Sequence, residues 1–138
     1  NTTLNNLEIA IEIRTNKCFF NLGKTLTTSI NKFKKHYPET DRYLEKWSVD
    51  RIAHVMKYEP NQYYNFLHCE NGGVPKNIKR VFAWMIFLNT KFLYQKFTAT
   101  PKEGDFYIWP AGWSHFHKGV NAPKETKYIL TGWCSYLI

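Results

Sequence analysis

The chain has 138 residues, enough to bury a hydrophobic core, and we expect one domain over residues 1–138. Aromatic residues make up 17% of the chain and alternate with Val, Ile and Thr, a composition that favours strands over helices. The longest apolar run covers residues 81–88 and is too short to cross a membrane, so we expect no membrane partner.

The net charge of +8 and the cysteines bear on partners and compartment. Four lysines, Lys24, Lys32, Lys34 and Lys35, fall in one predicted helix, where a solvated outer face is the simplest explanation. A basic surface could also steer an anionic substrate or nucleic acid, but no nucleic-acid-binding motif accompanies it. Three scattered cysteines argue against a disulfide framework and for a reducing, cytoplasmic compartment. The chain begins without Met, which fits a fragment or a processed chain, and it shows no signal peptide.

The front of the chain predicts a strand, a helix and a second strand. Residues 7–13 alternate apolar and polar side chains, as a strand does. Between residues 24 and 37 apolar residues recur at helical spacing until Pro38 ends the helix, and residues 41–47 add a predicted helical turn. The period then changes to two, and residues 51–58 predict a strand. Four of its side chains would share one face: Ile52, His54, Met56 and Tyr58.

The rest of the chain predicts short strands separated by turns. Extended segments are expected at 62–70, 80–89, 92–98, 105–109 and 126–137, with Gly- or Pro-containing turns between most of them. Six or seven short strands behind a helical front predict a mainly β (α+β) protein, a sandwich or barrel of the jelly-roll type.

Two short segments carry candidate metal ligands. Residues i and i+2 of a strand point to one face, so His68 and Glu70 can converge on one ion. His115 and His117 also lie two apart, after a turn that would bring the chain back across a sheet. A lone His-x-Glu is more often structural, but the second segment strengthens the metal interpretation. Two imidazoles and one carboxylate hold a non-haem ferrous ion on one face and leave three coordination positions open.

The last predicted strand places a cation on its inner face. Lys127, Ile129, Thr131 and Trp133 share this face because they are two residues apart. A lysine that faces a core is rare unless it is paired, and the nearby sequence offers no obvious acidic partner. Such a cation could anchor a dicarboxylate that fills two of the open coordination positions.

Five features follow one another in order between residues 51 and 133. They are Tyr58-Glu59-Pro60 ten residues before His68, the apolar stretch 80–89 that begins with Arg and ends in Leu-Asn, Pro101-Lys102-Glu103-Gly104-Asp105, His117-Lys118-Gly119, and Lys127 followed by Trp133. Each is weak alone. In this order they make the chain resemble the Fe(II)/2-oxoglutarate-dependent oxygenases, specifically the prolyl 4-hydroxylase-like branch and above all its phage and marine bacterial members.

This resemblance implies a double-stranded β-helix (jelly-roll or cupin-like) with N-terminal helices packed on one sheet. Iron would be bound by His68, Glu70 and His117. His117 is preferred over His115 because it is followed by x-Gly and precedes Lys127 by ten residues. The implied residues for the co-substrate 2-oxoglutarate are Lys127, which would pair with its distal carboxylate, and Tyr58 and Thr131 as further hydrogen-bond donors.

The resemblance also implies a reaction. Fe(II), 2-oxoglutarate and O2 would hydroxylate an unactivated C–H bond with release of CO2 and succinate, and ascorbate is a further candidate cofactor. A proline-containing protein or peptide is the implied substrate, and a phage protein would act in the host cytoplasm. Two alternatives stay open: an oxygenase of the same class acting on nucleic acid or a small metabolite, and a non-catalytic jelly-roll binding protein.

The sequence departs from the family pattern at three places. Glu70 stands where prolyl hydroxylases generally have Asp, and its extra methylene relaxes the geometry. Phe87 replaces a tyrosine that usually helps to bind the co-substrate. After Asn89 the family normally has an acidic stretch with Gly-Gly-x-Thr, which is lacking here. Either this loop is shortened or residues are missing from the chain, and we favour the second because the flanks match as though spliced.

Overall fold

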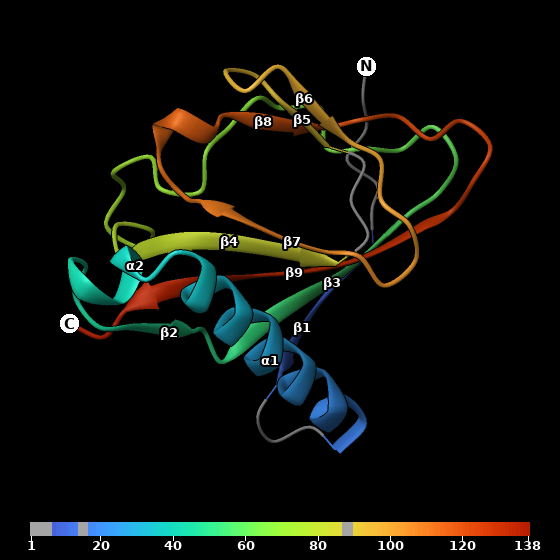
Figure 1. Ribbon diagram of the computed structural model, residues 1–138. Coiled ribbons are helices and arrows are strands. Elements are labelled where there is room, and N and C mark those ends of the chain that lie inside the picture. The colour runs from blue at the N-terminus through green and yellow to red at the C-terminus, as the bar shows by residue number, and fades with distance from the viewer. Residues whose placement is uncertain (1–6, 14–16, 87–89) are drawn as a thin grey trace.

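The computed structural model describes residues 7–13, 17–86 and 90–138, which form two facing β-sheets and a helical layer (Figure 1). The larger sheet has six strands in the order β1-β3-β9-β4-β7, with β2 paired to β9, and the smaller has the order β6-β5-β8. The strands found among these residues are β1 Leu7–Glu12, β2 Trp47–Val49, β3 Ile52–Tyr58, β4 Arg80–Ile86, β5 Thr90–Phe92, β6 Phe97–Ala99, β7 Phe106–Pro110, β8 His117–Gly119 and β9 Lys127–Tyr136.

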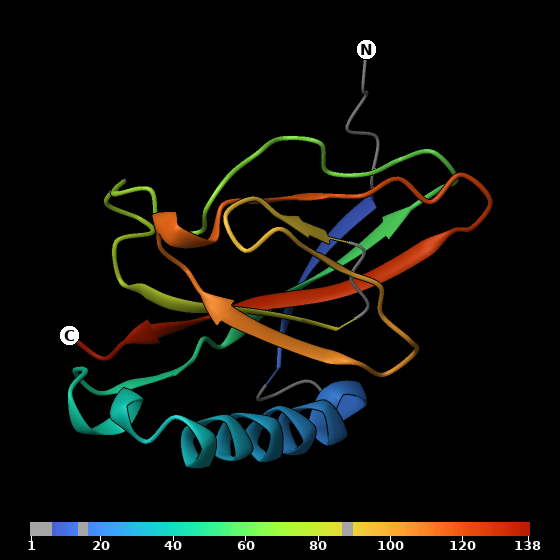
Figure 2. The same ribbon diagram turned by 45° about the horizontal axis from the view of Figure 1, so that its top comes forward.

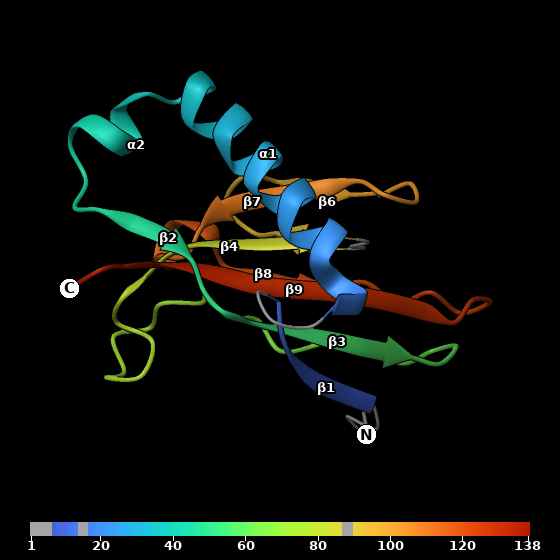
Figure 3. The same cartoon turned by 90° about the horizontal axis from the view of Figure 1, so that it is seen from below.

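The two α-helices lie on the side of the large sheet that faces away from the small sheet (Figure 2). Helix α1 (Phe20–His36) crosses this outer face, and the short helix α2 (Glu39–Arg42) follows it (Figure 3). Two short 3-10 helices, η1 (Lys17–Phe19) and η2 (Trp113–His115), complete the elements seen in the described ranges. None of the helices in these ranges is long and apolar enough to cross a membrane.

The main core lies between α1 and the large sheet. Leu26 and Ile30 are four residues apart, so both face the sheet from one side of the helix. There they pack in one cluster with Trp47, Phe82 and the fully buried Trp84. A second, smaller apolar cluster of Ala83, Phe92 and Trp109 joins the large sheet to β5 of the small sheet.

The predicted helix 24–37 is confirmed, although α1 begins earlier, at Phe20. Three of its four lysines are exposed, as a solvated face requires. Lys34 is the exception, because it pairs with Asp41 at 2.8 Å and its ammonium lies 4.3 Å from the ring centroid of Trp47. The helical turn predicted at 41–47 is present but lies earlier, as α2, and Trp47 begins strand β2, where its side chain packs in the core.

The single strand predicted at 92–98 is wrong, whereas the segment predicted as extended at 62–70 is extended without forming a regular strand. Residues 92–98 form a hairpin instead of one strand, because β5 ends at Phe92 and a turn with Lys96 at φ 50° reverses the chain into β6. Residues 62–70 are extended but form no regular strand. Their partner β8 has three residues, which leaves room for one bridge, between His68 and His117, and one further hydrogen bond, from Gly119 N–H to the Tyr64 carbonyl.

Gly132 on β9 lies opposite Trp84 on β4 and makes room for its indole. A Cβ at this position would lie 2.4 Å from Cζ2 of Trp84, which is too close for two carbon atoms. We therefore expect Gly132→Ala to lower the free energy of unfolding by about 1–3 kcal/mol, because Trp84 must leave its buried position. Urea unfolding followed by circular dichroism measures this change.

Gly72→Ala is the matched control, since a Cβ at Gly72 would meet nothing within 4 Å. This variant should unfold within a few tenths of a kcal/mol of the parent chain, about the range usual for surface substitutions. An equal loss in both variants would contradict the account of Gly132.

Candidate active site

A cavity of about 380 Å³ lies between the two sheets. Its walls come from β3, β9 and β4 of the large sheet, from β5 and β8 of the small sheet, and from the segment 62–70. All six site residues predicted from the sequence line this cavity: Tyr58, His68, Glu70, His117, Lys127 and Thr131.

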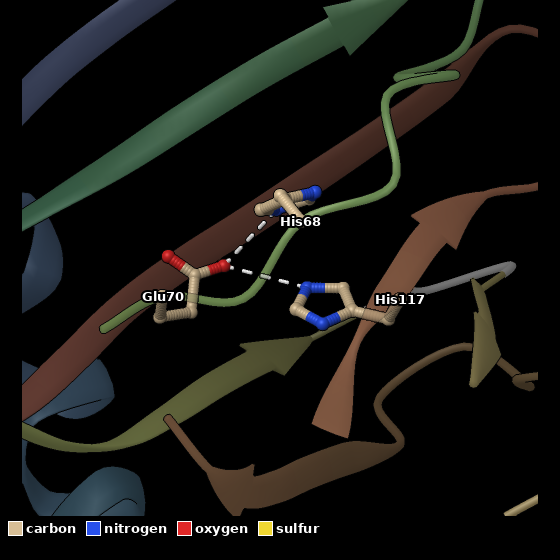
Figure 4. Close-up of side chains that lie close together, drawn as sticks. All are labelled: His68, Glu70 and His117. Atoms are coloured by element: carbon tan, nitrogen blue, oxygen red, sulfur yellow. Dashed lines mark ion pairs between the residues drawn. The ribbon is translucent and has the colours of Figure 1, made fainter. Parts of the chain in front are cut away.

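Two imidazoles and one carboxylate converge in the cavity (Figure 4). The Nε2 atoms of His68 and His117 lie 3.3 Å and 3.4 Å from the same Oε1 atom of Glu70. One ligand atom from each of the three side chains lies within 4.8 Å of the other two, so together they could hold a metal ion. The donor set, two nitrogens and one oxygen, is the set that suits Fe(II) with open positions.

Backbone carbonyls fix the orientation of both imidazoles. Nδ1 of His68 lies 2.9 Å from the carbonyl of Phe66, and Nδ1 of His117 lies 2.8 Å from the carbonyl of His115. Because a carbonyl only accepts hydrogen bonds, each Nδ1 must carry a proton, and each Nε2 faces Glu70, to which it donates a hydrogen bond when no metal is bound. In metal-binding histidines the same contact of the other ring nitrogen with a carbonyl leaves Nε2 for the metal. The backbone bridge between His68 and His117 brings the two rings to a centroid distance of 4.4 Å.

The second carboxylate oxygen of Glu70 is held from the other side. Oε2 accepts a hydrogen bond of 2.7 Å from Nε1 of Trp133 and lies 3.5 Å from the guanidinium of Arg80, which stacks on the Trp133 ring. Burial by itself would raise the pKa of Glu70. The hydrogen bonds from His117, His68 and Trp133 outweigh it and hold the pKa well below its usual range, so the carboxylate stays charged.

A cation lies at the other end of the cavity. Lys127 is half-buried, and its Nζ donates to the carbonyl of Val120 at 2.8 Å. No carboxylate within the described parts of the chain lies within 4 Å of it, and burial lowers its pKa. Tyr58, opposite Lys127 in the β3–β9 register, is 3% exposed, and burial raises its pKa to about 12. Two of the three ammonium protons of Lys127 remain for a ligand.

Solved structures of prolyl hydroxylases are similar to this chain in fold. The viral collagen prolyl hydroxylase of Paramecium bursaria Chlorella virus-1, solved with 2-oxoglutarate, superposes with a TM-score of 0.72 at 18% identity over 96% of this chain and 80% of its own. A Pseudomonas putida prolyl-4-hydroxylase gives 0.66 at 16% identity over 95% and 72%. A Burkholderia pseudomallei protein of the 2OG-Fe(II) oxygenase family gives 0.63 at 10% identity over 94% and 65%.

The chain has the fold of the prolyl 4-hydroxylases. The predicted double-stranded β-helix is thereby confirmed, with the N-terminal helices on one sheet. No family model matches the sequence, and no curated protein matches it either.

Two further residues named from the sequence are Thr131 and His115, and only the hydrogen bond of Thr131 differs from expectation. Thr131 lines the cavity, but its hydroxyl donates to the carbonyl of Trp84 at 2.9 Å, so it offers a ligand lone pairs and not the predicted proton. The imidazole of His115 lies outside the three-residue group and faces Ser114, as expected of a residue that does not ligate. Its backbone carbonyl nevertheless orients His117, a contribution that no side-chain pattern could reveal.

The glycine two residues after His117 has a structural reason. A Cβ at Gly119 would lie 2.9 Å from the carbonyl oxygen of Tyr64 and 3.0 Å from its nitrogen. Only glycine lets β8 approach the segment 62–70 this closely, and this approach pairs His68 with His117.

Two of the three departures from the family pattern, Phe87 and the junction after Asn89, lie outside the described residues.

Sequence reasoning did not predict the role of Trp133, whose indole N–H holds Glu70. Trp133→Phe keeps an aromatic ring beside Arg80 but removes this donor. We expect the variant to bind Fe(II) about ten- to a hundredfold more weakly, because groups that hydrogen-bond a ligand contribute that much to metal affinity. Anaerobic isothermal titration calorimetry measures the difference.

Trp113→Phe serves as the control, since Trp113 is 71% exposed and does not line the cavity. Its affinity for Fe(II) should equal that of the parent chain. If both variants or neither lost affinity, the hydrogen bond to Glu70 would not be the cause.

Proposed function

We propose that this chain is an Fe(II)- and 2-oxoglutarate-dependent dioxygenase that hydroxylates an unactivated C–H bond. His68, Glu70 and His117 would hold the iron, and Lys127 and Tyr58 would hold the co-substrate. One observation carries this proposal: two imidazole Nε2 atoms converge on one carboxylate oxygen in a cavity that also contains a half-buried lysine without an acidic partner among the described residues.

The residues divide the work between the two ends of the cavity. Iron and 2-oxoglutarate, when bound, would allow O2 to oxidise the substrate, and 2-oxoglutarate would be converted to succinate and CO2. Ascorbate is proposed as a supporting reductant. Glu70, kept charged by its hydrogen bonds, would balance part of the charge of the metal. Lys127 would bind the distal carboxylate, because a half-buried ammonium without a carboxylate partner is completed by an anion.

We further propose a proline-containing protein or peptide as substrate. The support is the fold, which the chain shares with proteins described as prolyl hydroxylases. A cytoplasmic location is proposed because Cys69 and Cys134 are free thiols, as a reducing compartment would leave them.

The decisive experiment is an anaerobic titration of 2-oxoglutarate into the Fe(II)-loaded protein. Bidentate chelation of ferrous iron by a 2-oxo acid produces a weak visible charge-transfer band, so a saturable band is expected. Bound iron without such a band would contradict the proposal and favour a non-catalytic jelly-roll. Succinate release in the presence of proline-rich peptides, compared with single-stranded DNA, then tests the substrate class.

A further inference from the structure

A second cavity, of about 570 Å³, adjoins the candidate active site. The two cavities share three side chains, those of His54, Arg80 and Trp133. Ser135 also lines the second cavity, and it lies two residues after Trp133 on β9, so both point to the same face of the large sheet. We call this second cavity the groove. An occupant of the groove would lie beside the indole that holds Glu70.

Asp50 lines this groove between β2 and β3. Its N–H donates to the carbonyl of Trp133 at 2.9 Å, and its Oδ2 accepts a hydrogen bond of 3.1 Å from the hydroxyl of Ser135. These contacts fix the carboxylate beside Trp133. The other oxygen, Oδ1, has no hydrogen bond in the described parts of the chain and is open to the groove.

No cation in the described ranges forms an ion pair with Asp50. The neighbouring Arg51 pairs with Glu12 at 3.2 Å, and Arg80 is directed at Glu70. Burial raises the pKa of Asp50, while the hydrogen bond from Ser135 and the charge of Arg80 lower it without offsetting the burial. A half-buried carboxylate that lacks an ion pair is unexpected in a chain with 19 basic and 11 acidic residues.

Asp50 and Lys127 are two comparable charged residues beside β9. Lys127 begins the strand, and Asp50 bonds to Trp133 and Ser135 near its end. Each is a half-buried charge without an ion pair in the described residues, although the charge of Arg80 acts on Asp50. The cation fits an anionic co-substrate, so by the same reasoning the carboxylate fits a cationic group of the molecule to be oxidised.

We propose that Asp50 binds an arginine or lysine side chain of a peptide substrate and thereby places a nearby residue of that peptide beside Trp133 at the metal. This inference rests on the proposed function and narrows its substrate to basic peptides. Glu8 and Glu12 lie on the same face of the sheet, opposite Met56 and Ile52 in the β1–β3 register. Both are already paired, Glu8 with His54 and Glu12 with Arg51, which leaves Asp50 as the groove carboxylate without an ion pair in the described residues.

Binding of short labelled peptides to the Fe(II)- and 2-oxoglutarate-loaded protein without O2 tests this proposal. Each peptide has a central proline in a Gly/Ser background, and one arginine is moved through every other position. Each arginine peptide has a control peptide with citrulline at the same position, since citrulline is neutral and has nearly the same shape as arginine. In at least one register the arginine peptide should bind about tenfold more tightly than its control peptide by fluorescence polarisation, as a charge-assisted bond provides.

Asp50→Asn should abolish this preference while keeping an oxygen for Ser135. Asp41→Asn is the matched control, because it removes the same charge from the helical side, where Asp41 pairs with Lys34, and it should keep the preference. Arginine-independent binding in every register, or a preference that survives Asp50→Asn, would overturn the proposal. Free arginine amide that competes as strongly as the peptide would overturn its peptide part.

The 2-oxoglutarate charge-transfer band, recorded on the same samples, separates the two proposals. A normal band without any arginine preference overturns the role of Asp50 and leaves the dioxygenase proposal standing. An Asp50-dependent preference without a band upholds a cation-binding groove and overturns the dioxygenase.

Discussion

Replacing Lys127 by methionine is expected to weaken the binding of 2-oxoglutarate about ten- to a hundredfold and to leave Fe(II) binding unchanged. A charge-assisted hydrogen bond to a carboxylate contributes this much to binding affinity where water is largely excluded. The ammonium is half-buried and has no carboxylate partner among the described residues, so its loss removes the main positive charge at that end of the cavity. Methionine keeps the length of the aliphatic stem and limits the loss of packing.

The anaerobic charge-transfer titration measures both quantities, since the band reports the co-substrate and calorimetry reports the iron. Lys91→Met is the control, because Lys91 is exposed and its neighbours Thr90 and Phe92 point the opposite way, into the interior. It should bind 2-oxoglutarate normally. A normal titration curve for Lys127→Met would remove the lysine from the co-substrate site.

The sequence predicted best where local periodicity and burial agree. Leu26 and Ile30 recur at helical spacing because one side of α1 faces the core. In β3 and β9, successive side chains point to opposite faces of the large sheet, so a spacing of two residues predicts which of them share a face. Prediction failed where a distant partner decides. Residues 92–98 have the apolar content of a strand, but the turn at Lys96 is set by pairing of β5 with β8 and β6.

The candidate site shows the same division. Spacing of two residues brings His68 to Glu70, and alternation along β9 turns Lys127 inward, so both follow from local sequence. The contact of Trp133 with Glu70 joins residues 63 apart, and the His54–Glu8 pair joins residues 46 apart. Such contacts depend on the order of strands in the sheet, which no spacing rule supplies.

Substituting alanine for His117 is expected to lower the affinity for Fe(II) by more than about a hundredfold. Losing a hydrogen bond that supports a ligand already lowers metal affinity about ten- to a hundredfold, and this substitution removes a ligand itself. The imidazole is 3% exposed, and its Nε2 is directed at Glu70. Turnover of 2-oxoglutarate should fall with the metal. Anaerobic calorimetry with Fe(II), together with succinate release, measures both effects.

His115→Ala is the sharpest control, since it removes an imidazole only two residues away. The carbonyl of residue 115 remains and still accepts from Nδ1 of His117, so the orientation of His117 is preserved. The only side-chain hydrogen bond lost among the described residues is the one with Ser114. Normal iron binding in this variant, beside its loss in His117→Ala, would separate a ligand from a neighbour that acts through its backbone. The reverse result would make His115 the ligand and would require β8 to shift against the segment 62–70, which the close contact of Gly119 with Tyr64 opposes.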